Sequence, residues 1–594
     1  MRFFATWASA LISTTSCIRA GTTPTPGPAL AAAPAPAPAP APVPEPVEYH
    51  LSPVLEHGRL TALAVEIHLR GDADGTTRLL LPDTWADARE LWRYVKDLQI
   101  TGARAVTEDG PGARVITAPA GAPLVVRYHV TSAYDREPTS DDGQPFAPII
   151  RPSFFNVFGE ALFAAPEGRE DDPARFAWTG APAGFGFASD LEHLAGARPG
   201  AVGDVLESVV LGGPGLKVHS RADGGARIRV ATLGEFGFGE AAFVALAMDV
   251  IAAERAFWDD HGAPFLIAMT ALQASPGSMS LGGTGRSDAF TLTVSQDAPV
   301  DRLRHLLAHE YFHTWNPREL GGLPEGPDEM TGKWFSEGFT EFYTWRLLLR
   351  AHIYTLEDFV AAWNDALREY ATSPVRGEPN ARIVADYWTV KAVGRLPYRR
   401  GPLLAAVWEQ RLRAATAGAR DLDDVLLAMR AQVRATRERE PDAARLFPPA
   451  YRALGGPDLT ADLDRFITRG EPIELPADVF GDCVRVTTTQ RRTFDRGWDP
   501  DATTSADNVI TGLRKGTPAH RAGLRDGMKI VRREAGEPGD STVAYVLRVR
   551  DGERERRIEF MPQGPDTIAV QQLSLAPDLT PERRAACERS LAGQ

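Results

Sequence analysis

Cysteine is scarce in this chain of 594 residues, which contains only Cys17, Cys483 and Cys587. Three thiols allow at most one disulfide within the chain. If Cys17 is removed or modified at the N-terminus, the other two cysteines remain near the C-terminus, and in an oxidising compartment they could form that disulfide. Two buried free thiols fit the sequence nearly as well, so both states stay open at this point.

Basic residues are also fewer than acidic residues. The chain has 65 lysine and arginine residues against 78 aspartate and glutamate residues, which gives a net charge of -13 and a pI of about 5.5. This balance argues against a nucleic-acid-binding surface. The basic residues are overwhelmingly arginine, which we attribute to codon usage rather than to function. The composition is globular, and the length predicts three or four domains.

The N-terminus predicts export. The apolar run Phe3–Ile12 follows a short basic start and is too short to cross a bilayer, as in a signal peptide over residues 1–20. A small residue before Cys17 resembles a bacterial lipoprotein cleavage box, although Thr14 stands where that box carries Leu, Val or Ile. Ordinary cleavage near Ala20 is the alternative, and an uncleaved tail is a third interpretation. The expected location is periplasmic, outer-membrane-anchored through a lipid on Cys17, or extracellular.

Residues 21–48 form a low-complexity segment in which proline and alanine alternate for most of its length. Proline fixes φ and donates no backbone hydrogen bond, so this composition predicts an extended, semi-rigid linker rather than a folded element. A spacer between an export signal and a catalytic body suits an enzyme that is tethered to a surface.

The most informative motif is HExxH over residues 309–313, followed by two carboxylates one helical turn apart. On a helix, His309 and His313 share a face and can bind one metal ion together with Glu337. Two histidines and one glutamate are a catalytic set for a single Zn²⁺, with one position left open. Glu310 is placed to act as the general base, and Glu341 to hold a ligand imidazole in its metal-binding tautomer.

Other interpretations of these segments are weaker. Without a metal, the motif would be a helical turn with two ordinary histidines. His305 continues the same stripe, and we interpret it as a packed or solvated neighbour rather than a ligand. The residues after His313 read Thr-Trp-Asn-Pro and lack the Gly and His spacing of a metzincin. The glycine-rich segment Leu281–Arg286 has no Lys-Ser/Thr ending, which excludes a P-loop.

Hydrophobic patterning divides the chain into folded parts. Alternating and β-branched runs predict strands in a β-sandwich-like domain over residues 49–214. Helical periodicity then predominates in a catalytic domain over residues 215–478, in which we expect a strand, the glycine-rich loop and another strand before a motif helix that begins at Asp297 or Pro299. Strand and turn signals return over residues 479–575, and residues 576–594 are expected to be a C-terminal tail.

Taken together, these motifs resemble the bacterial glycyl-aminopeptidase family of PDZ-bearing gluzincin zinc metallopeptidases. The resemblance rests on residues 309–316, residues 336–343 and Pro397–Gly401, which is similar to the family's Tyr-x-Lys-Gly element with Arg400 replacing lysine. It implies a multidomain α+β fold, with an N-terminal β domain, a thermolysin-like, mostly helical catalytic domain and a C-terminal PDZ-like domain. By this resemblance, Tyr398 is the hydrogen-bond donor to the transition state.

The C-terminal resemblance is carried by residues 509–530, which are similar to the middle of a PDZ domain. In that fold, a Pro-Ala pair such as Pro518-Ala519 opens a short helix and a glycine turn leads into a strand. PDZ domains bind peptides by adding a strand to a sheet edge. A module that only packs against the catalytic body fits this segment equally well.

One element departs from the family. Related aminopeptidases carry a Gly-Gly-x-Glu-His loop whose carboxylate helps to anchor the free amine of the substrate, whereas residues 282–286 read Gly-Gly-Thr-Gly-Arg. The candidate substrate-binding residues here are Gly282, Gly283 and Arg286, and Arg286 would bond a substrate carbonyl or acidic side chain. Burying an amine without a carboxylate is costly, so we expect little preference for free N-termini. The alternative is that an acid from elsewhere binds the amine.

The leading hypothesis from the sequence is an exported zinc metallopeptidase that hydrolyses peptide or protein substrates. The alternative, from another class, is a peptide-binding or chaperone-like exported protein with an inactive metal site. Intact ligands and base favour the enzyme. The sequence gives no indication of oligomeric state.

Overall fold

The computed structural model describes residues 45–594 except 87, 143–145, 181, 196–199, 275–278, 287, 325, 437–441 and 578. Residues 45–594 form one compact unit. The predicted export signal, Cys17 and nearly all of the proline-alanine linker lie outside the described residues. Within the described part of the chain, no helix has both the length and the apolar character needed to cross a membrane.

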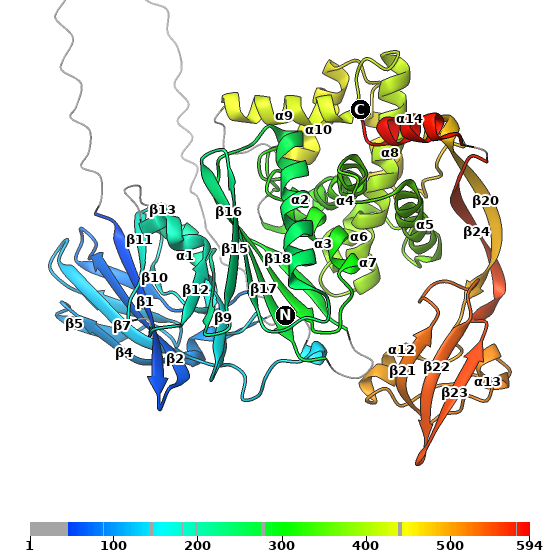
Figure 1. The fold of residues 1–594 in the computed structure, drawn as a ribbon. Coiled ribbons are helices and arrows are strands. Elements are labelled where there is room, and N and C mark those ends of the chain that lie inside the picture. Colours follow the sequence, from blue (N-terminus) through cyan, green and yellow to red (C-terminus); the bar gives the residue numbers. More distant parts are fainter. Residues whose placement is uncertain are drawn as a thin grey trace, which may run out of the picture. The chain divides into compact units, whose positions relative to one another are not determined.

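The first part of the described chain consists mainly of strands (Figure 1), in a six-stranded sheet ordered β13-β11-β1-β2-β7-β4 and two four-stranded sheets ordered β10-β3-β6-β5 and β12-β14-β9-β8. The elements are β1 (Val47–Glu56), β2 (Arg59–Arg70), β3 (Thr76–Leu80), β4 (Val95–Thr101), β5 (Ala105–Glu108), β6 (Ala113–Thr117), β7 (Pro123–Thr131), β8 (Ile149–Arg151), β9 (Phe154–Phe158), β10 (Ala165–Pro166), β11 (Pro173–Trp178), β12 (Gly186–Ser189), β13 (Gly200–Ala201), α1 (Val202–Leu206) and β14 (Val209–Gly213).

The third of these sheets differs from the two-sheet sandwich expected from the sequence. Its strand β14 is buried along its whole length. Because side chains alternate along a strand, Val210 packs into the core of the N-terminal strands, whereas Val209 and Leu211 pack with Leu233 and Leu266 of the following sheet. A strand buried on both faces has a continuous apolar sequence. Such a sequence predicts burial but does not indicate which two cores the strand lies between.

The second part combines a five-stranded sheet, ordered β15-β16-β17-β19-β18, with helices. Strands β16, β17 and β19 are parallel, and β15 and β18 are antiparallel edge strands. The strands are β15 (Lys217–Asp223), β16 (Ala226–Leu233), β17 (Phe265–Leu272), β18 (Leu281–Gly285) and β19 (Ala289–Ser295). The helices are α2 (Glu240–Trp258), α3 (Asp301–Phe312), α4 (Lys333–Arg350), α5 (Leu356–Thr372), α6 (Asn380–Asp386), α7 (Lys391–Arg395), α8 (Pro397–Ala415), α9 (Leu422–Thr436), α10 (Ala443–Ala453) and α11 (Thr460–Asp462).

Two features of this part correct the sequence predictions. The segment expected as a glycine-rich loop is the edge strand β18, because β19 supplies a complete antiparallel partner from Leu281↔Val294 to Gly285↔Phe290. The motif helix α3 begins at Asp301, later than the start expected at Asp297 or Pro299.

Helices α4 and α8 cross at two glycines, and this crossing positions the residues around it. A Cβ atom on Gly338 would lie 2.3 Å from the Cα atom of Gly401, so neither position tolerates a side chain. Helix α4 is buried from Trp334 to Leu349. Because the backbones touch, Glu337, one residue before Gly338, is brought towards the first turn of α8, which carries Tyr398.

The last part of the chain contains a two-stranded ribbon, β20 with β24, and a three-stranded antiparallel sheet ordered β21-β22-β23. These strands are β20 (Val484–Phe494), β21 (Lys529–Ala535), β22 (Tyr545–Asp551), β23 (Arg554–Phe560) and β24 (Gln563–Leu575), with short helices α12 (Pro500–Ser505) and α13 (Pro518–Arg521). The Pro-Ala pair opens a short helix and a strand follows, as the sequence predicts. The assignment of this part as a PDZ-like domain stays a prediction.

The segment predicted as the C-terminal tail contains a helix that was not expected, α14 (Pro581–Leu591). Thr580 caps it by accepting a hydrogen bond from the backbone N–H of Arg583, and Pro581 occupies the first turn. Cys587 forms a disulfide with Cys483, and the carbonyl of Ala592 accepts a hydrogen bond from Arg350 of α4. The disulfide that the sequence left open is thus present and joins the C-terminus to the body.

Candidate metal centre

Helices α3 and α4 bring together the residues of the two motifs. His309 lies on the last turn of α3 and His313 caps its C-terminus. Glu337 and Glu341 lie one turn apart on α4. The helices pack through the rings of Phe312 and Tyr343, whose centroids are 5.2 Å apart and nearly parallel. Apolar packing on one side of the helix pair therefore fixes the polar residues on the other.

The three predicted metal ligands form a compact triangle of donor atoms. The Nε2 atoms of His309 and His313 are 3.3 Å apart. Oε2 of Glu337 lies 3.5 Å from Nε2 of His309 and 3.3 Å from Nε2 of His313. Zn²⁺ bound tetrahedrally with bonds of about 2.0–2.1 Å requires donors about 3.3 Å apart. The spacing and the chemistry of these donors thus fit a zinc ion.

Burial and neighbouring charges set the ionisation of the triangle. Burial alone would raise the pKa of Glu337, but His313 and His309 beside it hold that pKa well below its usual range. The same pairing acts on His313, where burial is outweighed by the carboxylate of Glu337 and the pKa rises to about 9. Glu337 is therefore ionised at neutral pH and available as an anionic ligand.

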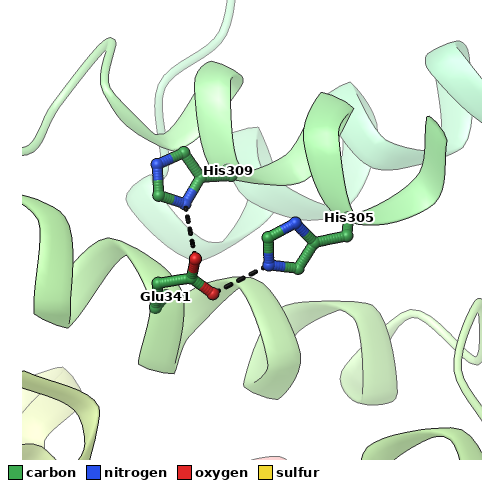
Figure 2. Close-up of side chains that lie close together, drawn as sticks. All are labelled: His305, His309 and Glu341. Atoms are coloured by element: carbon green, nitrogen blue, oxygen red, sulfur yellow. Dashed lines mark hydrogen bonds and ion pairs between the residues drawn. The ribbon is translucent and has the colours of Figure 1, made fainter. Parts of the chain in front are cut away.

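The carboxylate of Glu341 faces the imidazoles of both His309 and His305 (Figure 2). Its Oε1 lies 3.8 Å from Nδ1 of His309, and its Oε2 lies 2.8 Å from Nε2 of His305. Burial would raise the pKa of Glu341, but His305, His309 and Arg399 lower it to about 2. His305 is thus a packed, partly exposed neighbour, as the sequence suggested, and it also bonds the carboxylate that faces His309.

His305, His309 and Glu341 also have the spacing of a metal site. Two contacts argue against a second ion there. Oε2 of Glu341 already pairs with His305, and a guanidinium nitrogen of Arg399 lies 3.6 Å from Oε1. We assign this group to the support of His309, a role that carboxylates commonly serve beside metal-binding histidines.

A backbone carbonyl orients the second imidazole. Nδ1 of His313 lies 2.8 Å from the carbonyl oxygen of Asn316. The fully buried Asn316 side chain donates from Nδ2 to the carbonyl of Ser336, at 3.1 Å, and to Oγ1 of Thr340, at 3.0 Å. Asn316 therefore joins the segment after α3 to helix α4. No role of its own was predicted for Asn316, although an amide side chain directly after the motif was the available signal.

A cavity of about 680 Å³ opens onto these residues. His309, Glu310, His313, Glu337 and Tyr398 all line it. Burial raises the pKa of Glu310, although His309 and His313 partly offset the effect, which suits a base working near neutral pH. The structure thus brings the predicted ligands, base and hydrogen-bond donor to one cavity.

Tyr398 is held in this cavity by two aromatic neighbours. Its ring lies nearly parallel to the imidazole of His309, with centroids 5.7 Å apart. Its hydroxyl lies 3.3 Å from the hydroxyl of Tyr387, a residue that the sequence analysis missed. Burial raises the pKa of Tyr398 well above its usual value, so its hydroxyl keeps its proton at neutral pH and can donate a hydrogen bond.

The substrate-binding residues predicted from the glycine-rich segment do not all lie at the cavity. Gly283 and Arg286 line the cavity, whereas Gly282 is not among its lining residues. The side chain of Arg286 is 3% exposed. Its guanidinium pairs with Glu160 from the N-terminal β domain and stacks over Trp85, with Cζ 4.2 Å from the ring centroid. Arg286 is therefore already paired within the protein, and its bond to substrate stays a prediction. A buried cation needs an anionic partner, and the carboxylate of Glu160, 126 residues away in the sequence, is that partner.

These features are those expected of a metallopeptidase. Residues 302–390, which include both motifs, match the family model of the M61 glycyl aminopeptidases. The family expected from the motifs is thus confirmed for this segment. No curated protein matches the sequence significantly.

Many solved structures resemble the chain, among them the following two. The crystal structure of an aminopeptidase N family protein from Idiomarina loihiensis has a TM-score of 0.63 at 15% identity and covers 91% of this chain and 99% of that chain. At this identity the likeness establishes a shared fold alone. The crystal structure of an M1 zinc metallopeptidase from Deinococcus radiodurans has a TM-score of 0.41 at 15% identity, over 73% of this chain and 96% of that chain, and is too distant to bear on the assignment.

Proposed function

We propose that this protein is an exported, zinc-dependent peptidase that binds one Zn²⁺ through His309, His313 and Glu337. The observation that carries the proposal is the triangle of donor atoms 3.3–3.5 Å apart, each from a predicted ligand. Zinc in such a site supplies a Lewis acid that makes hydroxide available near pH 7. Export rests on the N-terminal sequence, which favours a periplasmic, surface-anchored or extracellular location.

The side chains around the triangle are proposed to transfer protons, to stabilise the developing negative charge and to orient the metal ligands. Glu310 accepts a proton from the attacking water on its carboxylate and returns it to the leaving amine. The hydroxyl of Tyr398 donates a hydrogen bond to the carbonyl oxygen of the scissile bond as negative charge develops there. Glu341 and the carbonyl of Asn316 hold the two imidazoles in orientation through their Nδ1 atoms.

Strand β18 is suited to hold the peptide substrate. It is the edge of the five-stranded sheet, and its residues Gly283, Thr284 and Gly285 line the cavity. An edge strand can pair with an extended peptide through backbone hydrogen bonds. A peptide antiparallel to β18 directs its N-terminus towards Arg286, where the carboxylates of Glu160 and Glu207 also line the cavity.

This arrangement reverses the expectation for free N-termini. Glu160 compensates the charge of Arg286, and the charge of Glu207 acts on Glu160, so acidic residues that the sequence of β18 lacks line the cavity. We therefore expect kcat/KM for a short peptide to fall at least about tenfold when its N-terminus is acetylated, since a cation loses its anionic partners. Paired assays of free and acetylated forms of one peptide series measure this. Equal rates would show that these carboxylates do not bind the amine.

The proposed function is tested by peptidase assays on the purified protein. Activity against a mixed peptide library is expected to disappear after dialysis against a chelator and to return with one equivalent of Zn²⁺ per chain. Chelation must leave the far-UV circular dichroism unchanged for the loss to report on chemistry. A folded, zinc-loaded protein that binds peptides and cleaves none would instead indicate a peptide-binding or chaperone-like protein.

A further inference from the structure

Lys333 occupies an unusual position beside the metal triangle. Its Nζ atom lies 3.3 Å from Oε1 of Glu337, the carboxylate oxygen that faces away from the triangle. The other oxygen, Oε2, is the one that lies 3.3–3.5 Å from the two imidazoles. The Lys333 side chain is only 12% exposed and lines the same cavity. The two oxygens of Glu337 thus have different partners.

Helix electrostatics do not account for a lysine at this position. Lys333 is the first residue of α4, where the positive end of the helix dipole disfavours a cation, and this first turn contains no acidic residue. A lysine four residues before a glutamate is also the weaker orientation of a helical ion pair. A second acidic neighbour, Glu329, lies 3.9 Å from Nζ of Lys333, but its side chain is 45% exposed, so that pair contributes little.

The choice of lysine over arginine is also informative. Only six of the 65 basic residues in the chain are lysines. A guanidinium offers two parallel donors and tends to bind both oxygens of a carboxylate, whereas an ammonium is a point charge that can hold one oxygen alone. At Lys333, an arginine could reach both oxygens of Glu337, including the one directed at the imidazoles.

From these observations we propose that Lys333 is a positioning residue that holds Oε1 of Glu337, so that only Oε2 is presented to the metal ion. This inference rests on the proposed zinc site of His309, His313 and Glu337. Without Lys333, the carboxylate can rotate and offer both oxygens, which raises the coordination number and weakens the preorganisation of the triangle. Lysine acts here through Glu337 and takes no part in proton transfer.

The test compares wild type, Lys333→Met, Lys333→Arg and the exposed control Lys391→Met, each as the full chain. Zn²⁺ affinity is measured by competition with a chromophoric chelator, and coordination by the visible absorption of the Co²⁺-loaded protein, which is stronger for four ligands than for five. We expect Lys333→Met to bind Zn²⁺ about tenfold or more weaker, in the range typical for residues that support metal ligands, and to show weaker Co²⁺ absorption. Lys391→Met should match wild type.

Lys333→Arg separates charge from geometry. It is expected to keep the charge but not the wild-type Zn²⁺ affinity or Co²⁺ spectrum. Wild-type affinity and spectrum in either Lys333 variant would overturn the inference, even if KM for peptides changed. If Lys333→Met does not fold, the Zn²⁺ affinity and Co²⁺ spectrum of Lys333→Arg test the inference by themselves. A wild-type protein that binds neither ion contradicts the proposed function itself, so the two failures are distinguishable.

Discussion

Replacing Glu310 by glutamine is expected to lower kcat by a factor of about a hundred or more while leaving the metal content unchanged. The amide is nearly isosteric with the carboxylate but cannot accept a proton, and general base catalysis typically contributes a factor of about 10²–10⁴. Glu310 is not one of the three donors of the triangle, so its loss should not release the ion. Steady-state kinetics and metal analysis of the same preparation measure both quantities.

A surface carboxylate provides the matched control for this substitution. Glu471 is paired with Arg465 on the surface, and Glu471→Gln changes the charge of the protein by the same amount. Exposed pairs contribute little to stability, so this variant should behave as wild type. A Glu310→Gln enzyme with wild-type turnover would remove Glu310 as the base. Loss of metal in that variant would show that Glu310 is a ligand or holds one.

Replacing Tyr398 by phenylalanine is expected to lower kcat by a factor of about 10²–10³ with little change in KM. A donor to a developing oxyanion acts mainly in the transition state, and removing one such donor typically costs that factor. The hydroxyl of Tyr398 is protonated at neutral pH because burial raises its pKa. Steady-state kinetics on one peptide substrate, with thermal unfolding as a check on stability, provide the measurement.

Tyr387 supplies the comparison for this variant. Its hydroxyl contacts that of Tyr398 at 3.3 Å, so Tyr387→Phe removes a partner of the proposed donor and leaves the donor itself in place. We expect a smaller fall in kcat for Tyr387→Phe than for Tyr398→Phe. Unchanged kcat in Tyr398→Phe, or a loss explained entirely by a lower unfolding temperature, would reduce Tyr398 to a buried aromatic of structural importance.

Most of the candidate metal site could be predicted from short-range patterns in the sequence. The four-residue spacing of His309 and His313, and of Glu337 and Glu341, is a property of single helices and could be predicted from the sequence. The two strands expected before the motif helix are β17 and β19, and helix α13 was expected from the PDZ resemblance. Tyr398 came from a family resemblance, because its approach depends on the crossing of α4 and α8 at Gly338 and Gly401.

Long-range partners could not be predicted. Glu160 meets Arg286 across 126 residues, and no local pattern marks that pair, so this ion pair could not be predicted. Strand β18 is poor in β-branched residues and forms because β19 pairs with it, which is a tertiary effect that overrides low strand propensity. Helix α14 is different, since its Thr-Pro start was a local signal that the sequence analysis passed over.

The central claim is that one metal ion is bound by His309, His313 and Glu337. Anomalous diffraction from crystals of the purified protein, collected on both sides of the zinc absorption edge, tests it most directly. The account predicts a single zinc peak per chain in contact with Nε2 of both imidazoles and Oε2 of Glu337. A peak between His305 and Glu341 instead, or no peak from protein supplied with Zn²⁺, would contradict it.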